Sequence, residues 1–161
     1  MLYKSDYINM EGTESIVVFN LELIDKEEKP LIPSVRFKNC PIRTSLGVLG
    51  KKWTLLILRD IAFLKIQRFN QILRSLPGLT PRVLIIRLKE LEEAGLIEPT
   101  IIQRKPKLVR WDLTQMGKDT VPILMSFISF GAKWYPEAVF EDKQPRTVKE
   151  IFPGQPVIRI L

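Results

Sequence analysis

The side chains that most often carry out chemistry in enzymes are scarce in this sequence. Its 161 residues contain no histidine and one cysteine, Cys40. These counts exclude imidazole-based mechanisms, His-ligated metal sites, an internal disulfide, and any cysteine cluster for zinc or iron–sulfur. No glycine-rich phosphate loop, nucleophile elbow or metal-ligand spacing is visible either. We therefore expect a protein that is not an enzyme and that uses no cofactor and no metal.

The remaining candidates for acid/base chemistry are three clustered glutamates, Glu90, Glu92 and Glu93. Two neighbouring carboxylates can serve as general acid and general base. However, Glu90 can pair locally with Arg87 or Lys89, and Glu93 falls on the expected exposed side of a helix. This pattern favours a solvated helix surface over a catalytic pair.

Positive charge is concentrated in the middle of the chain. Lys and Arg outnumber Asp and Glu by 25 to 18, which gives a net charge of +7 and a pI of about 9.6. Residues 41–118 carry a net charge of +9, residues 1–40 carry −2, and residues 119–161 carry none. Such a stretch is typical either of binding to phosphate backbones or of a basic surface without a partner, and charge alone does not separate the two.

The clearest local structure lies in residues 76–96. Thr80 suits a helix N-cap, Pro81 suits the first helical position, and Gly95 suits the helix end, so we predict a helix over residues 81–94. One face of this helix is apolar and expected to be buried, with Leu84, Leu88, Leu91 and Gly95. The opposite side carries Arg82, Ile86 and Lys89, with Ile85 on one flank.

The elements around this helix follow a recognisable order. Apolar spacing predicts shorter helices over residues 41–49, 52–63 and 69–76, with Trp53 and Phe69 facing inward. Two strands, over residues 97–103 and 107–113, should form a hairpin with a basic tip and with Trp111 facing the core. Helix, turn, capped helix and basic hairpin is the order of a winged helix-turn-helix. The fold class we expect is mainly α with a small β wing (α+β).

Both ends of the chain extend beyond this unit. Residues 1–39 are expected to form a β-hairpin or arm, with strands over residues 15–25 and 31–38. Residues 40–118 form the predicted DNA-binding domain. Residues 119–161 should supply a dimerisation helix and an extended tail, in which residues 157–161 could dock as a strand. The helix is expected to start after Thr114 and to run from residue 115 to about 139, although Pro122 could bend or delay it.

The start of the sequence lacks the apolar core and cleavage site of a secretory signal. The longest apolar stretch is too short to cross a bilayer. We therefore expect a cytoplasmic protein without a membrane partner.

Residues 40–118 resemble the HxlR-type branch of the MarR-like winged-helix transcriptional regulators. The matching pieces, in order, are Cys40-Pro41, Gly50-Lys51-Lys52-Trp53, Leu55-Leu56-Ile57-Leu58, Arg68-Phe69-Asn70, residues 76–80 (LPGLT), residues 88–96 (LKELEEAGL) and residues 113–117 (LTQMG). The resemblance implies a homodimer that binds operator DNA, with the terminal helices forming much of the dimer interface. Family members usually carry polar residues at the positions of Ile85 and Ile86.

The resemblance also bears on Cys40, since some family members use a cysteine before the first helix to sense oxidants or electrophiles. The alternative is a small buried residue beside the dimer interface. A small-molecule effector pocket between the long helix and the DNA-binding domain is a further expectation, without an identified ligand.

The function we predict is sequence-specific binding of double-stranded DNA at an inverted-repeat operator. The candidate contacts to bases or the groove come from the capped helix: Thr80, Pro81, Arg82, Ile85, Ile86 and Lys89. The candidate backbone or minor-groove contacts come from the wing and its surroundings: Arg104, Lys105, Lys107 and Arg68, with Lys51 and Lys52 as weaker candidates. The alternative is a winged-helix module that binds another protein through an apolar patch formed by Ile85 and Ile86.

Overall fold

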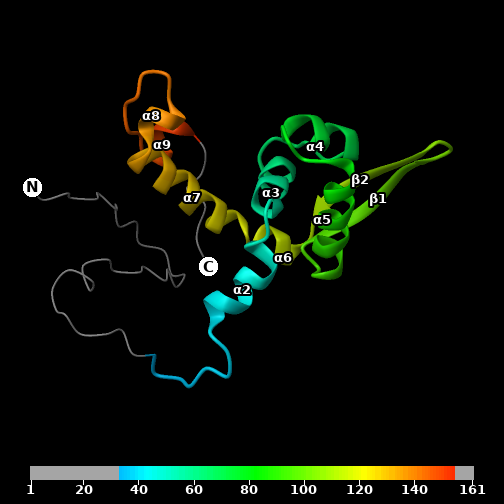
Figure 1. The fold of residues 1–161 in the computed structure, drawn as a ribbon, viewed down its shortest axis with the longest axis horizontal. Helices are drawn as coiled ribbons and strands as arrows, with labels where there is room; N and C mark the ends of the chain where they lie inside the picture. Colours follow the sequence, from blue (N-terminus) through cyan, green and yellow to red (C-terminus); the bar gives the residue numbers. More distant parts are fainter. Residues whose placement is uncertain (1–32, 155–161) are drawn as a thin grey trace, which may run out of the picture.

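The computed structural model describes residues 33–154, and the predicted strands over residues 15–25 and 157–161 lie outside that range (Figure 1). The second predicted strand, over residues 31–38, falls partly inside it. Residues 33–38 are exposed and form no strand, so this part of the prediction is wrong. Pro33 has no N–H to donate to a neighbouring strand, which disfavours pairing at this end of the segment.

The helical part of the domain comprises α2 (Pro41–Leu49), α3 (Thr54–Ala62), α4 (Phe69–Ser75) and α5 (Pro81–Glu93). Their apolar faces meet in one core that includes Ile57, Leu58 and Ile61 of α3, Ile72 of α4, and the leucines of α5. Trp53, Phe69 and Trp111 are partly buried against this core, as predicted. Helix α3 begins two residues later than predicted because Trp53 has a left-handed backbone, with φ 78°.

Helix α5 has the ends that the sequence predicted. The Thr80 side chain accepts a hydrogen bond from the Val83 N–H at 3.3 Å, and Pro81 occupies the first turn. Gly95 follows the C-cap residue Ala94 with φ 74°, a left-handed conformation that glycine adopts without steric cost. The capped helix is therefore fixed in both length and position.

The wing is an antiparallel hairpin of β1 (Ile97–Arg104) and β2 (Lys107–Leu113), and it projects from the domain (Figure 1). Ile97 pairs with Leu113 at the base of the hairpin, and Arg104 pairs with Lys107 at the tip. An isolated bridge between Arg68 and Arg110 adds the residue before α4 to the edge of β2. The wing is thus joined to the helices through the segment that leads into α4.

The predicted long helix over residues 115–139 is wrong. The chain forms a short α6 (Gln115–Lys118), then α7 (Val121–Trp134), then α8 (Pro136–Val139). Pro122 has no N–H to bond the carbonyl four residues earlier, so a new helix starts around it. Pro136 disfavours helical geometry at Tyr135, where φ is −126° and ψ is 44°.

The tail is also more ordered than predicted. Residues 148–151 form a helical turn, α9 (Val148–Ile151), whose N-terminus carries a capping box between Thr147 and Glu150. This Thr-x-x-Glu pattern is present in the sequence and favours a helix start. Helix α9 folds back on α7, and the Arg146 N–H bonds the Ala132 carbonyl at 3.4 Å.

The LTQMG segment fixes the C-terminal helices to the DNA-binding unit. The Thr114 hydroxyl donates to the Gly95 carbonyl at 2.5 Å, and the Thr114 N–H donates to the Leu96 carbonyl at 3.1 Å. The same hydroxyl oxygen accepts from the Gly117 N–H at 3.0 Å. A Cβ on Gly117 would lie 2.0 Å from the Leu96 carbonyl oxygen, so only glycine permits this approach.

We predict that Gly117→Ala lowers the free energy of unfolding by about 1–3 kcal/mol, because the added methyl group overpacks against backbone that cannot move aside cheaply. Chemical denaturation followed by circular dichroism measures this. The matched control is Gly47→Ala in α2, where a Cβ meets nothing within 4 Å. That variant should be as stable as the parent protein or up to about 1 kcal/mol more stable. Equal stability of the two variants would contradict the prediction.

Candidate nucleic-acid interface

Helix α5 turns opposite faces to the core and to solvent. Leu84, Leu88 and Leu91 are buried, as predicted. The residues predicted to contact DNA from this helix are all exposed: Thr80, Pro81, Arg82, Ile85, Ile86 and Lys89. Burial of the leucine face fixes the rotation of the helix, so the opposite face with Arg82 and Lys89 points outward.

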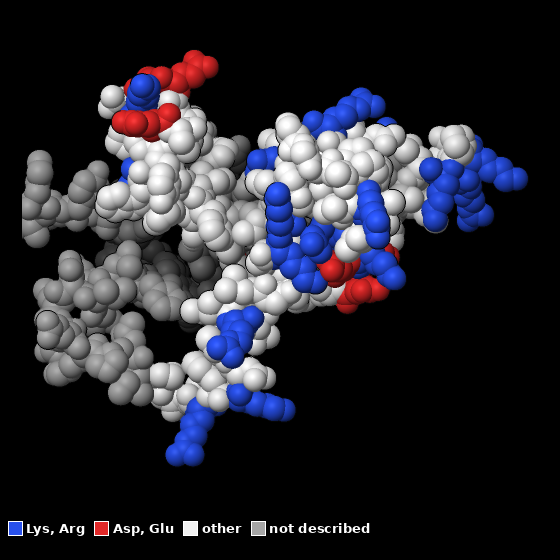
Figure 2. Space-filling view, viewed as in Figure 1, with Lys and Arg blue, Asp and Glu red and all other residues white. Residues whose placement is uncertain are grey.

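The basic residues of the wing lie far from the core. Arg104, Lys105 and Lys107 are exposed around the hairpin tip, and the Lys105 carbonyl accepts from the Gln103 side-chain amide at 2.8 Å. Figure 2 shows Lys and Arg side chains over the region of α5 and again at the end of the hairpin. Arg68 is exposed at the start of α4 and bridges to β2. Helix and wing thus present basic groups from two separated points of one domain.

An ion-pair network ties α5 to the segment between α2 and α3. The Lys51 ammonium lies 3.0 Å from Glu90 Oε1, and Arg87 pairs with Glu90 Oε2. Arg87 Nε also donates to the Lys52 carbonyl at 3.0 Å. Hydrogen bonds from Lys51 and then Arg87 lower the pKa of Glu90, so this carboxylate stays ionised near neutral pH. Of the two local pairings predicted for Glu90, that with Arg87 is confirmed, whereas Lys89 lies 3.6 Å from Glu93 instead.

This network makes Lys51 a weaker candidate for a phosphate contact. Its charge is already partly compensated by Glu90, so it offers less to a phosphate than the sequence indicated. Lys52 is exposed, and its ammonium lies 5.0 Å from the centre of the Trp53 ring. The Lys51–Glu90 pair spans 39 residues, and no local spacing rule could have found it.

Asp112 holds the base of the wing, a role that sequence reasoning missed. It accepts hydrogen bonds from the Gln67 amide at 2.7 Å, the Thr100 hydroxyl at 3.0 Å and Arg110 Nε at 2.8 Å. Partial burial on its own raises the pKa of Asp112, but the hydrogen bonds from Arg110, Thr100 and Gln67 outweigh it, and the pKa lies below its ordinary value. The only sequence signal was an acidic residue in an otherwise apolar and basic strand.

A second carboxylate, Asp60, connects α3 to α4 and is fully buried. Arg59 donates to it through Nε at 3.0 Å and Nη2 at 2.6 Å, and the Ser75 hydroxyl donates to its other oxygen. Buried charges are tolerated when they are paired and hydrogen-bonded in this way. The arrangement is structural, since it fixes the helix that precedes α5.

An open hollow of about 210 Å³ lies beside α5 on the wing side. It is lined mostly by apolar groups, from Phe69, Ile85, Leu88, Lys89, Glu92 and Trp111. The predicted effector pocket was placed elsewhere, between the long helix and the DNA-binding domain, and it stays a prediction.

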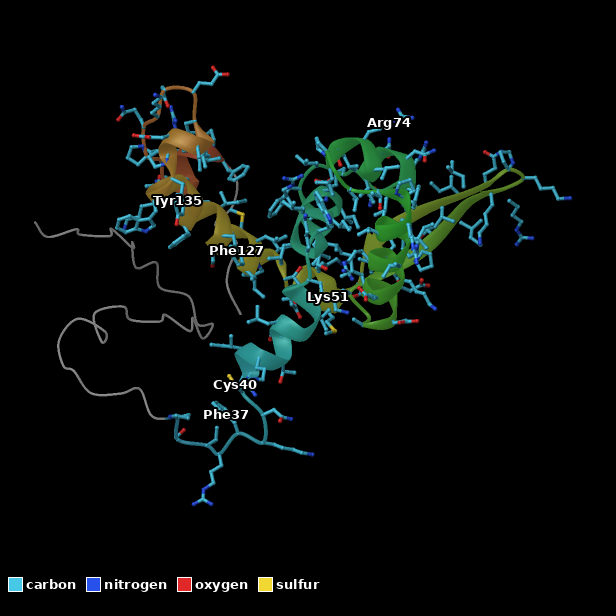
Figure 3. The ribbon with its side chains drawn as sticks, viewed as in Figure 1. Phe37, Cys40, Lys51, Arg74, Phe127 and Tyr135 are labelled. Atoms are coloured by element: carbon cyan, nitrogen blue, oxygen red, sulfur yellow. The ribbon has the colours of Figure 1, made fainter. Side chains whose placement is uncertain are left out.

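Cys40 lies at the start of α2 with its side chain exposed (Figure 3). Its carbonyl accepts from the Thr44 N–H at 3.0 Å and from the Thr44 hydroxyl at 3.1 Å. The thiol itself caps nothing. The Cys40 side chain is thus exposed in the single chain, and its burial beside a dimer interface stays a prediction.

Residues 33–154 contain no cluster of three or more His, Cys, Asp or Glu side chains that could hold a metal ion. Within the same range, no helix is both long enough and apolar enough to cross a membrane.

The capped helix α5, the supporting helix α4 and the basic hairpin define a winged helix-turn-helix domain, the class that inserts one helix into the major groove of DNA. Residues 48–139 match the family model of the HxlR-like helix-turn-helix proteins. The chain belongs to this family and is a transcriptional regulator with a helix-turn-helix DNA-binding domain.

Individual relatives agree with this assignment. The chain is 32% identical over 98 residues to the HTH-type transcriptional regulator YdeP of Bacillus subtilis, an alignment that covers 61% of this chain and 76% of YdeP. A solved structure assigned to the MarR family of transcriptional regulators, from Porphyromonas gingivalis, is similar with a TM-score of 0.52 at 31% identity, over 62% of this chain and 96% of that one. The redox regulator HypR in its reduced form is similar with a TM-score of 0.53 at 27% identity, over 64% of this chain and 99% of HypR.

Proposed function

We propose that this regulator binds double-stranded DNA sequence-specifically, as a homodimer on an inverted-repeat operator. The observation that carries the proposal is the outward face of α5, where Arg82 and Lys89 are exposed opposite the buried leucines. A helix fits the major groove, and the N-terminal turn of α5 brings the positive end of its dipole towards phosphates. Arginine is the side chain that most often reads guanine.

Each candidate residue has a role in this arrangement. Six exposed residues at the start and along the outward side of α5 face the groove: Thr80, Pro81, Arg82, Ile85, Ile86 and Lys89. Arg82, in the first turn, is the principal reader of a base. Arg104, Lys105 and Lys107 contact the backbone or minor groove from the wing tip, and Arg68 contacts a phosphate near α4. In domain terms, residues 40–118 form the DNA-binding domain and residues 119–161 supply most of the dimer contacts.

The exposed apolar surface of the projecting helices supports the homodimer. Helices α2 and α7 extend from the domain away from the wing (Figure 1). Helix α7 exposes Ile123, Phe127, Phe130 and Trp134, and α2 exposes Ile42 and Leu46. Phe127 keeps 59% and Ile42 71% of its surface exposed in the single chain, and water-exposed apolar surface of this extent favours burial against a second copy.

Two variants test the DNA-binding roles against each other. Arg82→Ala should cost about 1–3 kcal/mol of binding free energy and relax selectivity at one base position, because it removes a base contact. Lys105→Ala should weaken binding on all sequences alike and lower the slope of log affinity against log salt by about one, because it removes a phosphate contact. Gel shifts on selected and random duplexes over a salt series measure both.

An equal loss on every sequence would demote Arg82 to a phosphate contact, and an unchanged slope would remove Lys105 from the interface. Binding of parent protein that does not depend on salt would contradict the proposal itself.

The dimer is tested at Phe127. We expect the parent protein to sediment as a dimer, and Phe127→Glu to sediment as a folded monomer of 18.7 kDa because a charge cannot be buried in an apolar contact. The control Leu64→Glu changes another exposed apolar residue, in the loop after α3, and should remain a dimer. Sedimentation velocity measures the oligomeric state of all three proteins. A dimeric Phe127→Glu variant would rule out the exposed apolar face of α7 as the dimer interface.

We further propose that oxidation of Cys40 lowers DNA affinity. The exposed thiol at the start of α2 supports this, and so does the similarity to HypR, a redox regulator. The chain has no second cysteine, so two copies of Cys40 in a dimer, or an external thiol, would complete a disulfide.

Peroxide should therefore weaken DNA binding by the parent protein, as measured by gel shift, and should have little effect on Cys40→Ser. Addition of a reducing agent should restore the parent. An equal loss of affinity in both proteins under peroxide would refute the role of Cys40.

A further inference from the structure

Two adjacent isoleucines stand on the outward side of α5. Ile85 keeps 58% and Ile86 43% of its surface exposed, whereas the leucines of the same helix are buried. Neither isoleucine belongs to the core, nor to the partly buried residues packed on it. Isoleucine is also a weaker helix former than alanine or leucine. Neither core packing nor helix propensity therefore explains why isoleucine stands at positions 85 and 86.

Their neighbours on the helix surface are cationic. Arg82 lies four residues before Ile86, and Lys89 lies three residues after it, so the three share one face of the helix. Ile85 lies towards the wing, where it lines the hollow beside Lys89, Phe69 and Trp111. On this surface, positively charged groups alternate with apolar groups. A partner that matches it must be anionic and must carry apolar groups between its negative charges.

Duplex DNA has these two properties in its major groove. Its phosphates are anionic, and each thymine presents a 5-methyl group beside hydrogen-bonding edges. An isoleucine in a helix keeps essentially one χ1 rotamer, so its methyl groups are held in place before binding. An acidic protein surface with apolar side chains would match the same pattern, but the helix-turn-helix family of this chain and the basic tip of its wing favour the duplex.

We propose that Ile86, with Ile85 on the wing side, contacts thymine 5-methyl groups. The preferred operator then contains A·T pairs next to the base pair read by Arg82. This inference rests on the proposed DNA binding, and it assigns the base preference of the central part of α5.

Replacement of thymine by deoxyuridine tests the inference, since it removes the methyl group alone. Duplexes are first selected from a random library by the parent protein, and each thymine of the selected duplex is then replaced singly. At one or two positions in each half-site the dissociation constant should rise about four-fold, the change that corresponds to about 0.8 kcal/mol for one buried methyl-sized group.

The rise in dissociation constant caused by deoxyuridine should disappear at one of these thymine positions in Ile86→Ala, and at the adjacent thymine position in Ile85→Ala. Both variants should keep their helix content and unfolding midpoint, because the replaced side chains are exposed. The control Leu64→Ala shortens an exposed side chain in the loop after α3, outside the candidate DNA contacts, and should retain the parent's sensitivity to deoxyuridine.

The possible outcomes separate the two proposals. If selected duplexes bind with steep salt dependence but no deoxyuridine position matters, the methyl contact is wrong and the DNA-binding function stands. Sensitivity that persists in both isoleucine variants also overturns the inference. If no duplex is enriched and binding is insensitive to salt, the DNA-binding function fails, and an apolar protein contact takes its place.

Discussion

Burial of the leucine face of α5 is the interaction on which the remainder of the domain depends. Leu84, Leu88 and Leu91 pack into the core formed with α3 and α4, and they leave no freedom of rotation about the helix axis. Each such leucine contributes on the order of 1.5–3 kcal/mol by leaving water. The same burial forces Arg82, Ile86 and Lys89 outward, so the stability of the core and the orientation of the binding face have a single cause.

Polar contacts at the edges of this core hold the other parts of the interface in place. Asp112 joins the wing to the segment before α4, and Glu90 joins α5 to the segment before α3. Thr114 and Gly117 close the backbone of α6 onto Gly95 and Leu96. Because these contacts sit at the junctions of elements, they set the position of the wing and of the projecting helices relative to α5.

The projecting helices carry a different kind of surface from the DNA-facing side. Along α7, one side contributes Leu124 and Ala132 to buried positions, while Phe127 and Trp134 remain exposed. A helix that is apolar on more than one side requires more than one partner. Helix α9 and the residues before it supply part of this cover, and the Arg146 N–H donates to the carbonyl of Ala132 in α7 at 3.4 Å. The remaining exposed apolar side chains lie on α7 and on α2, the helix that Cys40 precedes.

Local signals were sufficient for the parts of the fold governed by nearby residues. Thr80, Pro81 and Gly95 fixed the limits of α5 because capping and left-handed backbone depend on residues within one turn. The helix-turn-helix order, the hairpin and the buried leucines followed in the same way. The predicted helix over residues 115–139 is wrong because Pro122 begins a new helix and Pro136 ends it at Trp134. Helix α9 has a capping box that is visible in the sequence, but a single helical turn also needs the contact with α7 to be stable.

The sequence by itself determined the class of protein, the identity of the outward residues on α5 and the absence of imidazole chemistry. Only the tertiary structure decided that Lys51 is engaged by Glu90, that Asp112 holds the wing, and that Gly117 must lack a side chain. These facts depend on groups brought together from positions 21 to 45 residues apart in the chain, and the distance between such groups is set by the packing of whole elements rather than by any local pattern.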